Sequence, residues 1–225
     1  MSRRGAFLVL EGIDGSGTTT QSEALRLLLE GEGIPAVVTR EPTSGPVGKL
    51  LRQALTKQLA EDGAPVELDW TTLALLFAAD RMDHVRREIE PAVASGQVVI
   101  CDRYDLSSLI YQSETSPHPE ETLDWVRALN RQAMRPDLVL VLAIDPDIAE
   151  ARRRARGGPE ELFERRELQR RLAARYREAP KVVGEEGVVL VEGDEPAQAL
   201  SQRLLGLIRQ RLPGLFVPNL PPTDN

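Results

Sequence analysis

The stretch Glu11-Gly12-Ile13-Asp14-Gly15-Ser16-Gly17-Thr18-Thr19-Thr20 decides the fold of this chain. It follows the apolar run 7–10 and precedes a helical pattern that covers residues 21–30. A glycine-rich turn between a strand and a helix is the context in which the pattern G-x-x-x-x-G-K-[ST] indicates phosphate binding. The sequence therefore predicts a phosphate site, with Thr18 at the position where the pattern has lysine.

The glycines of this loop have a mechanical role, because they allow positive φ angles and a close approach of the backbone to a phosphate. Successive N–H groups and the N-terminus of the following helix then form an anion cradle. Thr19 stands where the pattern places the hydroxyl that binds Mg²⁺. We expect ATP to bind along the loop through Gly12, Ile13, Asp14, Gly15, Ser16, Gly17, Thr18, Thr19 and Thr20. The alternative is a glycine-rich turn that binds no ligand.

Length and composition narrow the class of protein. The 225 residues suffice for one large domain or at most two, and 41% of them are hydrophobic. The net charge of −7 does not suggest nucleic-acid binding. No apolar run approaches the ~20 residues that span a membrane, and the N-terminus leads directly into the first strand. A single cysteine, Cys101, excludes a disulfide within the chain. These features predict a cytoplasmic protein.

Five apolar runs predict buried parallel strands at 7–10, 36–39, 98–101, 138–144 and 188–191. Helical periods lie between them, at about 19–31, 45–59, 70–94, 120–134, 147–156, 160–179 and 196–211. Alternating strands and helices predict an α/β fold with a parallel sheet and helices on both faces. Ligands bind beyond the carboxyl ends of such strands, where the loops 12–20, 40–45 and 102–108 converge. We expect one domain over 1–212 and an irregular, proline-rich tail over 213–225.

Three further segments carry a family resemblance. They are Thr39-Arg40-Glu41-Pro42-Thr43-Ser44-Gly45, the stretch from Leu75 to Arg81, and Asp102-Arg103-Tyr104-Asp105-Leu106-Ser107-Ser108 with Tyr111-Gln112. Together with the first loop they resemble the thymidylate kinases, P-loop enzymes that phosphorylate dTMP with ATP. The resemblance runs in order from about residue 6 to about residue 195. It implies a three-layer P-loop NTPase fold with a five-stranded parallel sheet, a helical lid and a homodimer.

The resemblance implies roles for the residues of the acceptor site. Phe77 should stack on the thymine ring. Arg81, one turn further along the same helix face, should contact the base or the adjacent site. Arg40 and Arg103 should bind the dTMP phosphate. Gln112 should hydrogen-bond the base, and Tyr111 should close against the sugar. The full expected substrate-binding set is Arg40, Glu41, Pro42, Phe77, Arg81, Arg103, Ser107, Ser108, Tyr111 and Gln112.

Charge at the transferring phosphate should come from Mg²⁺ and arginines. The resemblance implies that Thr19 and Asp102 hold the metal and that Asp14 positions the acceptor nucleotide. A lid is expected over about residues 150–166, and its arginines should supply the charge that Thr18 does not carry. The expected catalytic residues are Asp14, Arg103, Arg153, Arg154 and Arg156. A solvated basic helix end is the alternative for the arginine cluster.

Two other functions fit the same sequence. One is a kinase for a different nucleoside monophosphate or a small phosphorylated metabolite. The other is a nucleotide-binding protein of the same fold with impaired catalysis. The expected small-molecule partners are ATP and dTMP, and we expect neither nucleic acid nor a membrane as a partner.

Overall fold

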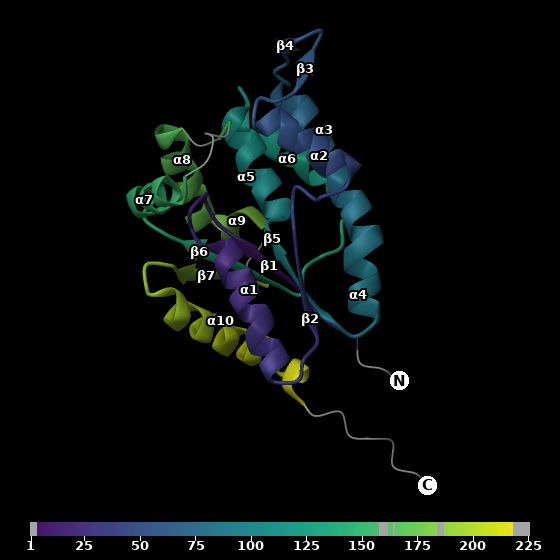
Figure 1. The fold of residues 1–225 in the computed structure, drawn as a ribbon, viewed down its shortest axis with the longest axis vertical. Helices are drawn as coiled ribbons and strands as arrows, with labels where there is room; N and C mark the ends of the chain where they lie inside the picture. The colour runs from purple at the N-terminus through teal and green to yellow at the C-terminus, as the bar shows by residue number, and fades with distance from the viewer. Residues whose placement is uncertain (1–3, 158–161, 164, 184–186, 218–225) are drawn as a thin grey trace.

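A five-stranded parallel sheet forms the centre of the protein (Figure 1). The computed structural model describes residues 4–157, 162, 163, 165–183 and 187–217. The strands run in the order β2-β5-β1-β6-β7, and Leu8 of β1 lies opposite Ile100 of β5 and Leu138 of β6. Each predicted strand is confirmed: β1 (Phe7–Glu11), β2 (Ala36–Arg40), β5 (Val98–Asp102), β6 (Leu138–Ala143) and β7 (Val188–Glu192).

Helices cover both faces of the sheet, because successive side chains of a strand point to opposite sides. Phe7 and Val9 pack in one hydrophobic cluster with α3, α5, α6 and α8. Leu8 and Leu10 pack in a second cluster with α1 and α10 (Figure 1). The three-layer α/β arrangement is therefore as predicted. These helices are α1 (Thr18–Gly31), α3 (Trp70–His84), α5 (Asp105–Thr115), α6 (Pro119–Leu129), α8 (Arg166–Arg177) and α10 (Ala197–Arg211).

The helix expected over 70–94 contains an irregular turn. It consists of α3, a π-helical turn over Val85–Ile89, and α4 (Glu90–Ala94). A π-helical turn shifts the phase of the residues that follow it and occurs frequently at functional sites. The turn begins directly after the polar residues Asp80, Arg81 and His84 at the end of α3.

The structure corrects the prediction at α5. Residues 105–115 form a helix, whereas the sequence suggested a loop through Ser108 and a substrate-side stretch beyond it. Leu106, Leu109 and Ile110 supply the apolar face of this helix. Buried Ser108 and Gln112 interrupt the apolar period that predicts a helix, because they serve the site rather than the core.

Several helix ends also differ from expectation. The helix predicted over 45–59 is α2 (Pro46–Leu55), and a short hairpin of β3 (Ala60–Glu61) and β4 (Ala64–Pro65) follows it. Asp62-Gly63 forms the turn with positive φ at both residues, which is typical of Asp-Gly hairpins. The helix predicted over 120–134 ends at Leu129.

The expected lid corresponds in part to two helices. The helix predicted over 147–156 is α7 (Pro146–Arg156), and the one predicted over 160–179 is α8 followed by the short α9 (Ala179–Val183). Residues 158–161 and 164 of the expected lid lie outside the described residues.

The expected tail begins with a 3₁₀ turn over Pro213–Phe216, and Leu215 is buried against the cluster beneath α10. Residues 218–225 lie outside the described part of the chain. Among the described helices, none is long and apolar enough to cross a bilayer.

Candidate active site

The first loop has the geometry of a phosphate cradle. Gly15 has φ 90° and Gly17 has φ 96°, values that favour glycine. Gly17 precedes the first turn of α1 and provides no side-chain cap, so the N–H groups of that turn remain available to an anion. A Cβ atom on Gly15 would lie 2.4 Å from the carbonyl oxygen of Ala149. Helix α7 therefore packs directly on the loop.

The hydroxyls of this loop differ in their surroundings. Thr18 is buried, whereas Thr19 and Thr20 are exposed. The Thr19 hydroxyl donates to Oδ2 of Asp102 at 2.5 Å. Oδ1 of Asp102 is buried without a hydrogen-bond partner among the described residues. Oxygen atoms from the first turn of α1 and from the end of β5 thus lie side by side at the carboxyl edge of the sheet.

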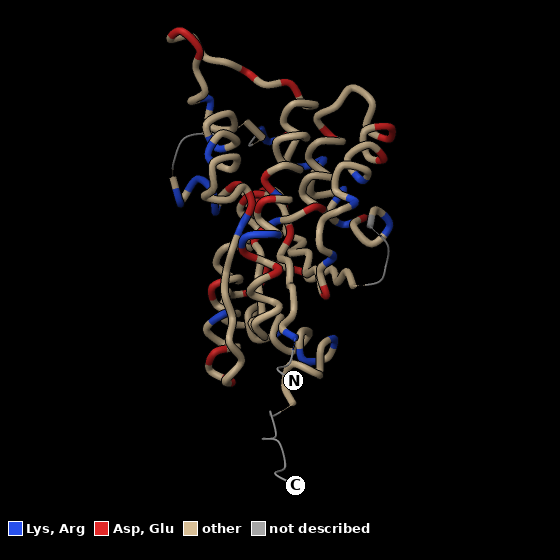
Figure 2. The backbone as a smooth tube through the Cα atoms, turned by 90° about the vertical axis from the view of Figure 1, so that its right-hand side faces the viewer, with Lys and Arg blue, Asp and Glu red and all other residues tan. Residues whose placement is uncertain are grey.

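A cavity of about 100 Å³ opens beside this loop. Its lining includes charged residues of both signs, and such residues gather near the middle of the molecule (Figure 2). Half-buried Phe77 contributes an aromatic ring to it. The other predicted residues that line the cavity are Asp14, Glu41, Pro42, Arg81, Arg103, Ser107, Ser108, Tyr111 and Gln112. Leu55, Tyr104 and Phe163 also line it and were not predicted from the sequence.

Arg40 is the member of the predicted substrate set that does not line this cavity. It ends β2, is exposed, and lines a neighbouring hollow that includes Thr19, Thr43, Arg52 and Asp102. The structure therefore brings Arg40 to the Thr19 side of the loop after β2, apart from Phe77 and Arg103.

Arg103 lies at the centre of a dense polar cluster. Its Nη2 contacts Oδ1 of Asp14 at 2.5 Å, and its Nη1 donates to the carbonyl oxygen of Gly12 at 2.9 Å. Its guanidinium also lies over the ring of Tyr111, 5.4 Å from the centroid. Burial opposes its charge, but the neighbouring Tyr111 and Asp14 raise the pKa of Arg103 well above its usual value. Arg103 is therefore a permanent cation between the phosphate loop and the cavity.

Glu11 supports this cluster from the end of β1 and was not among the residues predicted from the sequence. Its Oε1 accepts from the backbone N–H groups of Tyr104 and Ser107 at 2.8 and 3.1 Å. Its Oε2 accepts from the hydroxyls of Ser107 and Tyr176 at 2.6 and 3.0 Å. Burial raises the pKa of Glu11, against the lowering effect of these bonds and of Arg103. A charged residue at the end of an apolar strand was the available signal.

Helix α8 adds two more groups that gave no signal in the sequence. Gln169 Nε2 donates to Oδ2 of Asp14 at 3.1 Å, and the Tyr176 hydroxyl lies 2.8 Å from that of Ser107. Both come from one face of α8, seven residues apart. Burial raises the pKa of Tyr176 well above its usual value, so its hydroxyl stays protonated. The helix after the expected lid is thus tied to the phosphate loop and to α5.

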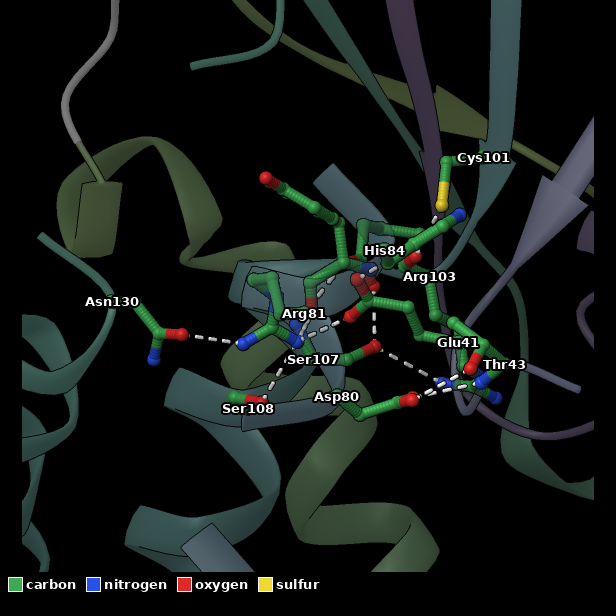
Figure 3. Close-up of polar contacts among 12 residues, drawn as sticks. Glu41, Thr43, Asp80, Arg81, His84, Cys101, Arg103, Ser107, Ser108 and Asn130 are labelled. Carbon is green, nitrogen blue, oxygen red and sulfur yellow. Dashed lines mark hydrogen bonds and ion pairs between the residues drawn. The ribbon is translucent and has the colours of Figure 1, made fainter. Parts of the chain in front are cut away.

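The loop after β2 is held by α3 (Figure 3). Asp80 accepts from the backbone N–H and the hydroxyl of Thr43 at 2.7 and 2.6 Å. Arg81 Nη2 contacts Oε2 of Glu41 at 2.6 Å, and His84 Nδ1 lies 3.1 Å from Oε1 of the same carboxylate. Arg81 and His84 therefore occupy both carboxylate oxygens of Glu41. Glu41 supports the wall of the cavity that it lines.

The arginines of α7 fall into two groups. Arg153 Nη1 donates to the carbonyl oxygen of Asp14 at 2.7 Å. Arg152 Nη1 would lie 3.9 Å from a Cβ on Gly17, and its Nη2 lies 3.4 Å from the carbonyl oxygen of Gly193. Arg154 instead pairs with Glu150, and Arg156 is exposed. Arg152 and Arg153 therefore adjoin the phosphate loop, and Arg152 was not among the predicted residues.

A phosphate loop beside a cavity at the carboxyl edge of a parallel sheet defines the class of P-loop nucleotide kinases. The family model for thymidylate kinase matches residues 10–204. The chain belongs to the thymidylate kinase family and is an enzyme of that family.

Relatives support this membership along nearly the whole chain. A probable thymidylate kinase of Pyrococcus abyssi is 37% identical over 212 residues, which cover 94% of this chain and 100% of the relative. A thymidylate kinase of Ruegeria pomeroyi is 40% identical over 178 residues, or 78% of this chain and 82% of the relative. The structure of the Candida albicans thymidylate kinase covers 93% of each chain with a TM-score of 0.79 at 23% identity, a likeness of fold.

Proposed function

We propose that this enzyme transfers the γ-phosphoryl group of Mg-ATP to dTMP, giving dTDP and ADP. One observation carries the choice of base. Nε of Arg81 and Oε1 of Gln112 are buried without hydrogen-bond partners among the described residues, and both residues line the cavity that holds Phe77. A buried unpaired donor and a buried unpaired acceptor are costly unless a ligand satisfies them.

Thymine offers the complementary edge. Its carbonyl oxygen can accept from Arg81 Nε, its ring N–H can donate to Gln112 Oε1, and its flat face can stack on Phe77. Arg81 can only donate, because a guanidinium has no acceptor. The amino group of cytosine would present a donor to that position and leave two donors opposed. The arrangement therefore favours a base with a carbonyl there.

Arg103 is suited to the acceptor phosphate. It lies between the phosphate loop and the base cavity and is already aligned by Asp14 and Gly12. A guanidinium fork matches two phosphate oxygens. An incoming phosphate would take over part of the Asp14 contact, which frees the Asp14 carboxylate for a sugar hydroxyl. Both predicted roles of these residues are thus compatible with one substrate pose.

The donor nucleotide fits the loop before α1. Backbone N–H groups there would hold its phosphates, and the adjoining Arg152 and Arg153 would supply the charge that Thr18 lacks. A single arginine at a transferring phosphate can contribute about 10³–10⁵ in rate. We propose these two arginines for that role in place of Arg154, which is engaged with Glu150.

Magnesium would bind at Thr19 and Asp102. Asp102 Oδ1 lacks a partner among the described residues, and the Thr19 hydroxyl adjoins Oδ2 of the same carboxylate. The described residues hold no cluster of three or more metal-binding side chains. This fits Mg²⁺, which retains several waters and binds mainly through nucleotide phosphates and one or two protein oxygens. The metal would neutralise charge on the phosphates.

We also propose one domain over residues 1–212 and a homodimeric, cytoplasmic enzyme, in keeping with the family resemblance. The proposal as a whole is tested by an ADP-release assay with ATP, Mg²⁺ and a panel of nucleoside monophosphates. We expect turnover with dTMP well above that with dCMP, dAMP or dGMP. Equal or faster turnover with another monophosphate would mean that dTMP is not the preferred substrate. Absence of turnover with all of them would indicate a catalytically impaired homologue.

A further inference from the structure

His84 occupies a buried position behind the base cavity. The residue is 2% exposed and lies at the end of α3, one turn after Arg81. Its Nδ1 lies 3.1 Å from Oε1 of Glu41, and its Nε2 lies 2.6 Å from the hydroxyl of Thr39. His84 does not line the cavity itself. Because the His84 ring is buried and both of its nitrogens have partners, we interpret its contact with Glu41 as structural.

Glu41 in turn fixes Arg81 (Figure 3). With one oxygen held by His84, the carboxylate keeps a single orientation, and its other oxygen engages Arg81 Nη2. Arg81 Nη1 also donates to Asn130 Oδ1 at 2.6 Å, and Nη2 also donates to the Tyr104 carbonyl oxygen at 2.9 Å and to the Ser108 hydroxyl at 3.1 Å. Nε is buried and has no hydrogen-bond partner among the described residues, so it is available to a ligand.

We propose that His84 is a positioning residue for base recognition. It locks the Glu41 carboxylate so that Arg81 presents its Nε to the carbonyl oxygen of a pyrimidine in the cavity. The inference rests on the proposed function, because that function supplies the pyrimidine. Rotation of Glu41 would let the Arg81 guanidinium turn within its bonds, and a direct bond to a base tolerates little misalignment.

The hydrogen bond from His84 Nδ1 to Glu41 can form whether the ring is neutral or charged. The Glu41 carboxylate, paired with Arg81, only accepts, so Nδ1 of His84 carries a proton. Nε2 faces the Thr39 hydroxyl, which also lies 3.1 Å from Oε2 of Glu88. A charged ring donates to Thr39, which then donates to Glu88. A neutral ring accepts from Thr39 instead. The bond to Glu41 is the same in each case.

Two substitutions separate the two ends of the ring. In His84→Asn, the side-chain amide nitrogen can take the place of Nδ1 and still donate to Glu41. In His84→Gln, the amide reaches the place of Nε2 near Thr39 and leaves Glu41 Oε1 unbonded. His118→Gln, at the exposed second histidine of the chain, is the matched control.

The measurement is the Kd of dTMP by calorimetry, with KM for dTMP and for ATP and the melting temperature of each variant. We expect His84→Gln to weaken dTMP by about tenfold or more, the loss of roughly one charge-assisted hydrogen bond. His84→Asn should restore the affinity to within about threefold of wild type. KM for ATP should stay unchanged in both variants.

Equal dTMP affinity in the two His84 variants, or a parallel rise in KM for ATP, would overturn the inference. If His84→Gln does not fold, the same question is answered by a cycle of His84→Ala with Glu41→Gln. His84→Ala should weaken dTMP by about tenfold in the wild-type background and change it much less in the Glu41→Gln background, and an equal loss in both backgrounds would contradict the role. Failure of wild-type enzyme to bind dTMP would instead refute the proposed function.

Discussion

Arg153 Nη1 donates a hydrogen bond to the backbone carbonyl oxygen of Asp14 over 2.7 Å. This bond joins α7 to the phosphate loop four residues before Thr18, which stands at the lysine position of the motif. Because Ala149 also touches Gly15, the first turns of α7 are docked on the loop in this structure. Arg152 and Arg153 are thus adjacent to the donor site without a large movement of the chain.

Arg153→Ala should lower turnover by more than about 100-fold, equivalent to ~2.7 kcal/mol of transition-state stabilisation, and leave dTMP binding nearly intact. Arg152→Ala should have a comparable effect on turnover. Arg154→Ala is the matched control and should change turnover less than about threefold, because its guanidinium pairs with Glu150. Steady-state kinetics with calorimetric dTMP titrations decide the matter, and equal effects of all three substitutions would contradict the assignment.

Thr18→Lys tests the same compensation from the other side. In an enzyme that merely lacked a cation, a restored lysine would speed turnover by roughly 10- to 150-fold, the value of a charge-assisted bond of ~1.5–3 kcal/mol. We expect no gain, because two guanidinium groups already adjoin the loop and would repel the new ammonium. A tenfold acceleration in single-turnover measurements would argue against the arginines.

Phe77→Ala should weaken dTMP far more than ATP, because stacking serves only the acceptor base. Stacking on an aromatic ring contributes ~1–3 kcal/mol, or about 5- to 150-fold in affinity. Separate calorimetric titrations with dTMP and a non-hydrolysable ATP analogue measure the two effects. Equal weakening of both nucleotides would mean that Phe77 supports the fold rather than the base.

Arg103→Ala should abolish measurable dTMP binding and most turnover with the fold intact. Arg103→Lys is the informative comparison, since it keeps a charge but loses the fork that reaches both Asp14 and the Gly12 carbonyl. We expect the lysine variant to recover only a small part of the affinity. Near-normal dTMP affinity in Arg103→Ala would show that Arg103 does not bind the acceptor phosphate.

Glu11 gives a pH prediction. Burial raises its pKa in the folded protein above its usual 4.5, so the folded state binds this proton more tightly than the unfolded state. Its contribution to the free energy of unfolding is therefore present below pH 4.5 and decreases as pH rises through the raised pKa. Glu11→Gln should lack this decline, whereas the exposed control Glu121→Gln should retain it. Urea unfolding from pH 4.5 to 8 measures the slopes, and identical slopes in all three proteins would refute the raised pKa.

The sequence predicts the sheet and the phosphate loop well, because both depend on local pattern. Five apolar runs correspond to the five strands, and the glycines at 15 and 17 adopt the positive φ angles that the loop requires. Helix α5 escaped prediction because its buried serines and Gln112 obscure the apolar period. Polar residues that serve a site read as loop in a sequence and become a helix only through tertiary packing.

The site itself shows the same limit. Residues within motifs, such as Phe77 and Tyr111, line the cavity. Tyr176 and Gln169 reach the site from α8 through contacts more than 60 and 150 residues away along the chain, and no local pattern marks them. Arg40 lies within a motif, yet it lines the hollow beside Thr19 and not the cavity that holds Phe77. Its motif position does not determine on which side of the loop its side chain lies.

The most direct test of the account follows the label from [γ-³²P]ATP to dTMP in the wild-type enzyme. We predict labelled dTDP that requires Mg²⁺, forms at a rate well above that of labelled dCDP from dCMP, and falls by more than about 100-fold in Arg153→Ala. Absence of labelled dTDP in the wild type, or formation at the same rate in Arg153→Ala, would contradict the claim that this enzyme phosphorylates dTMP with arginines of α7 in place of the loop lysine.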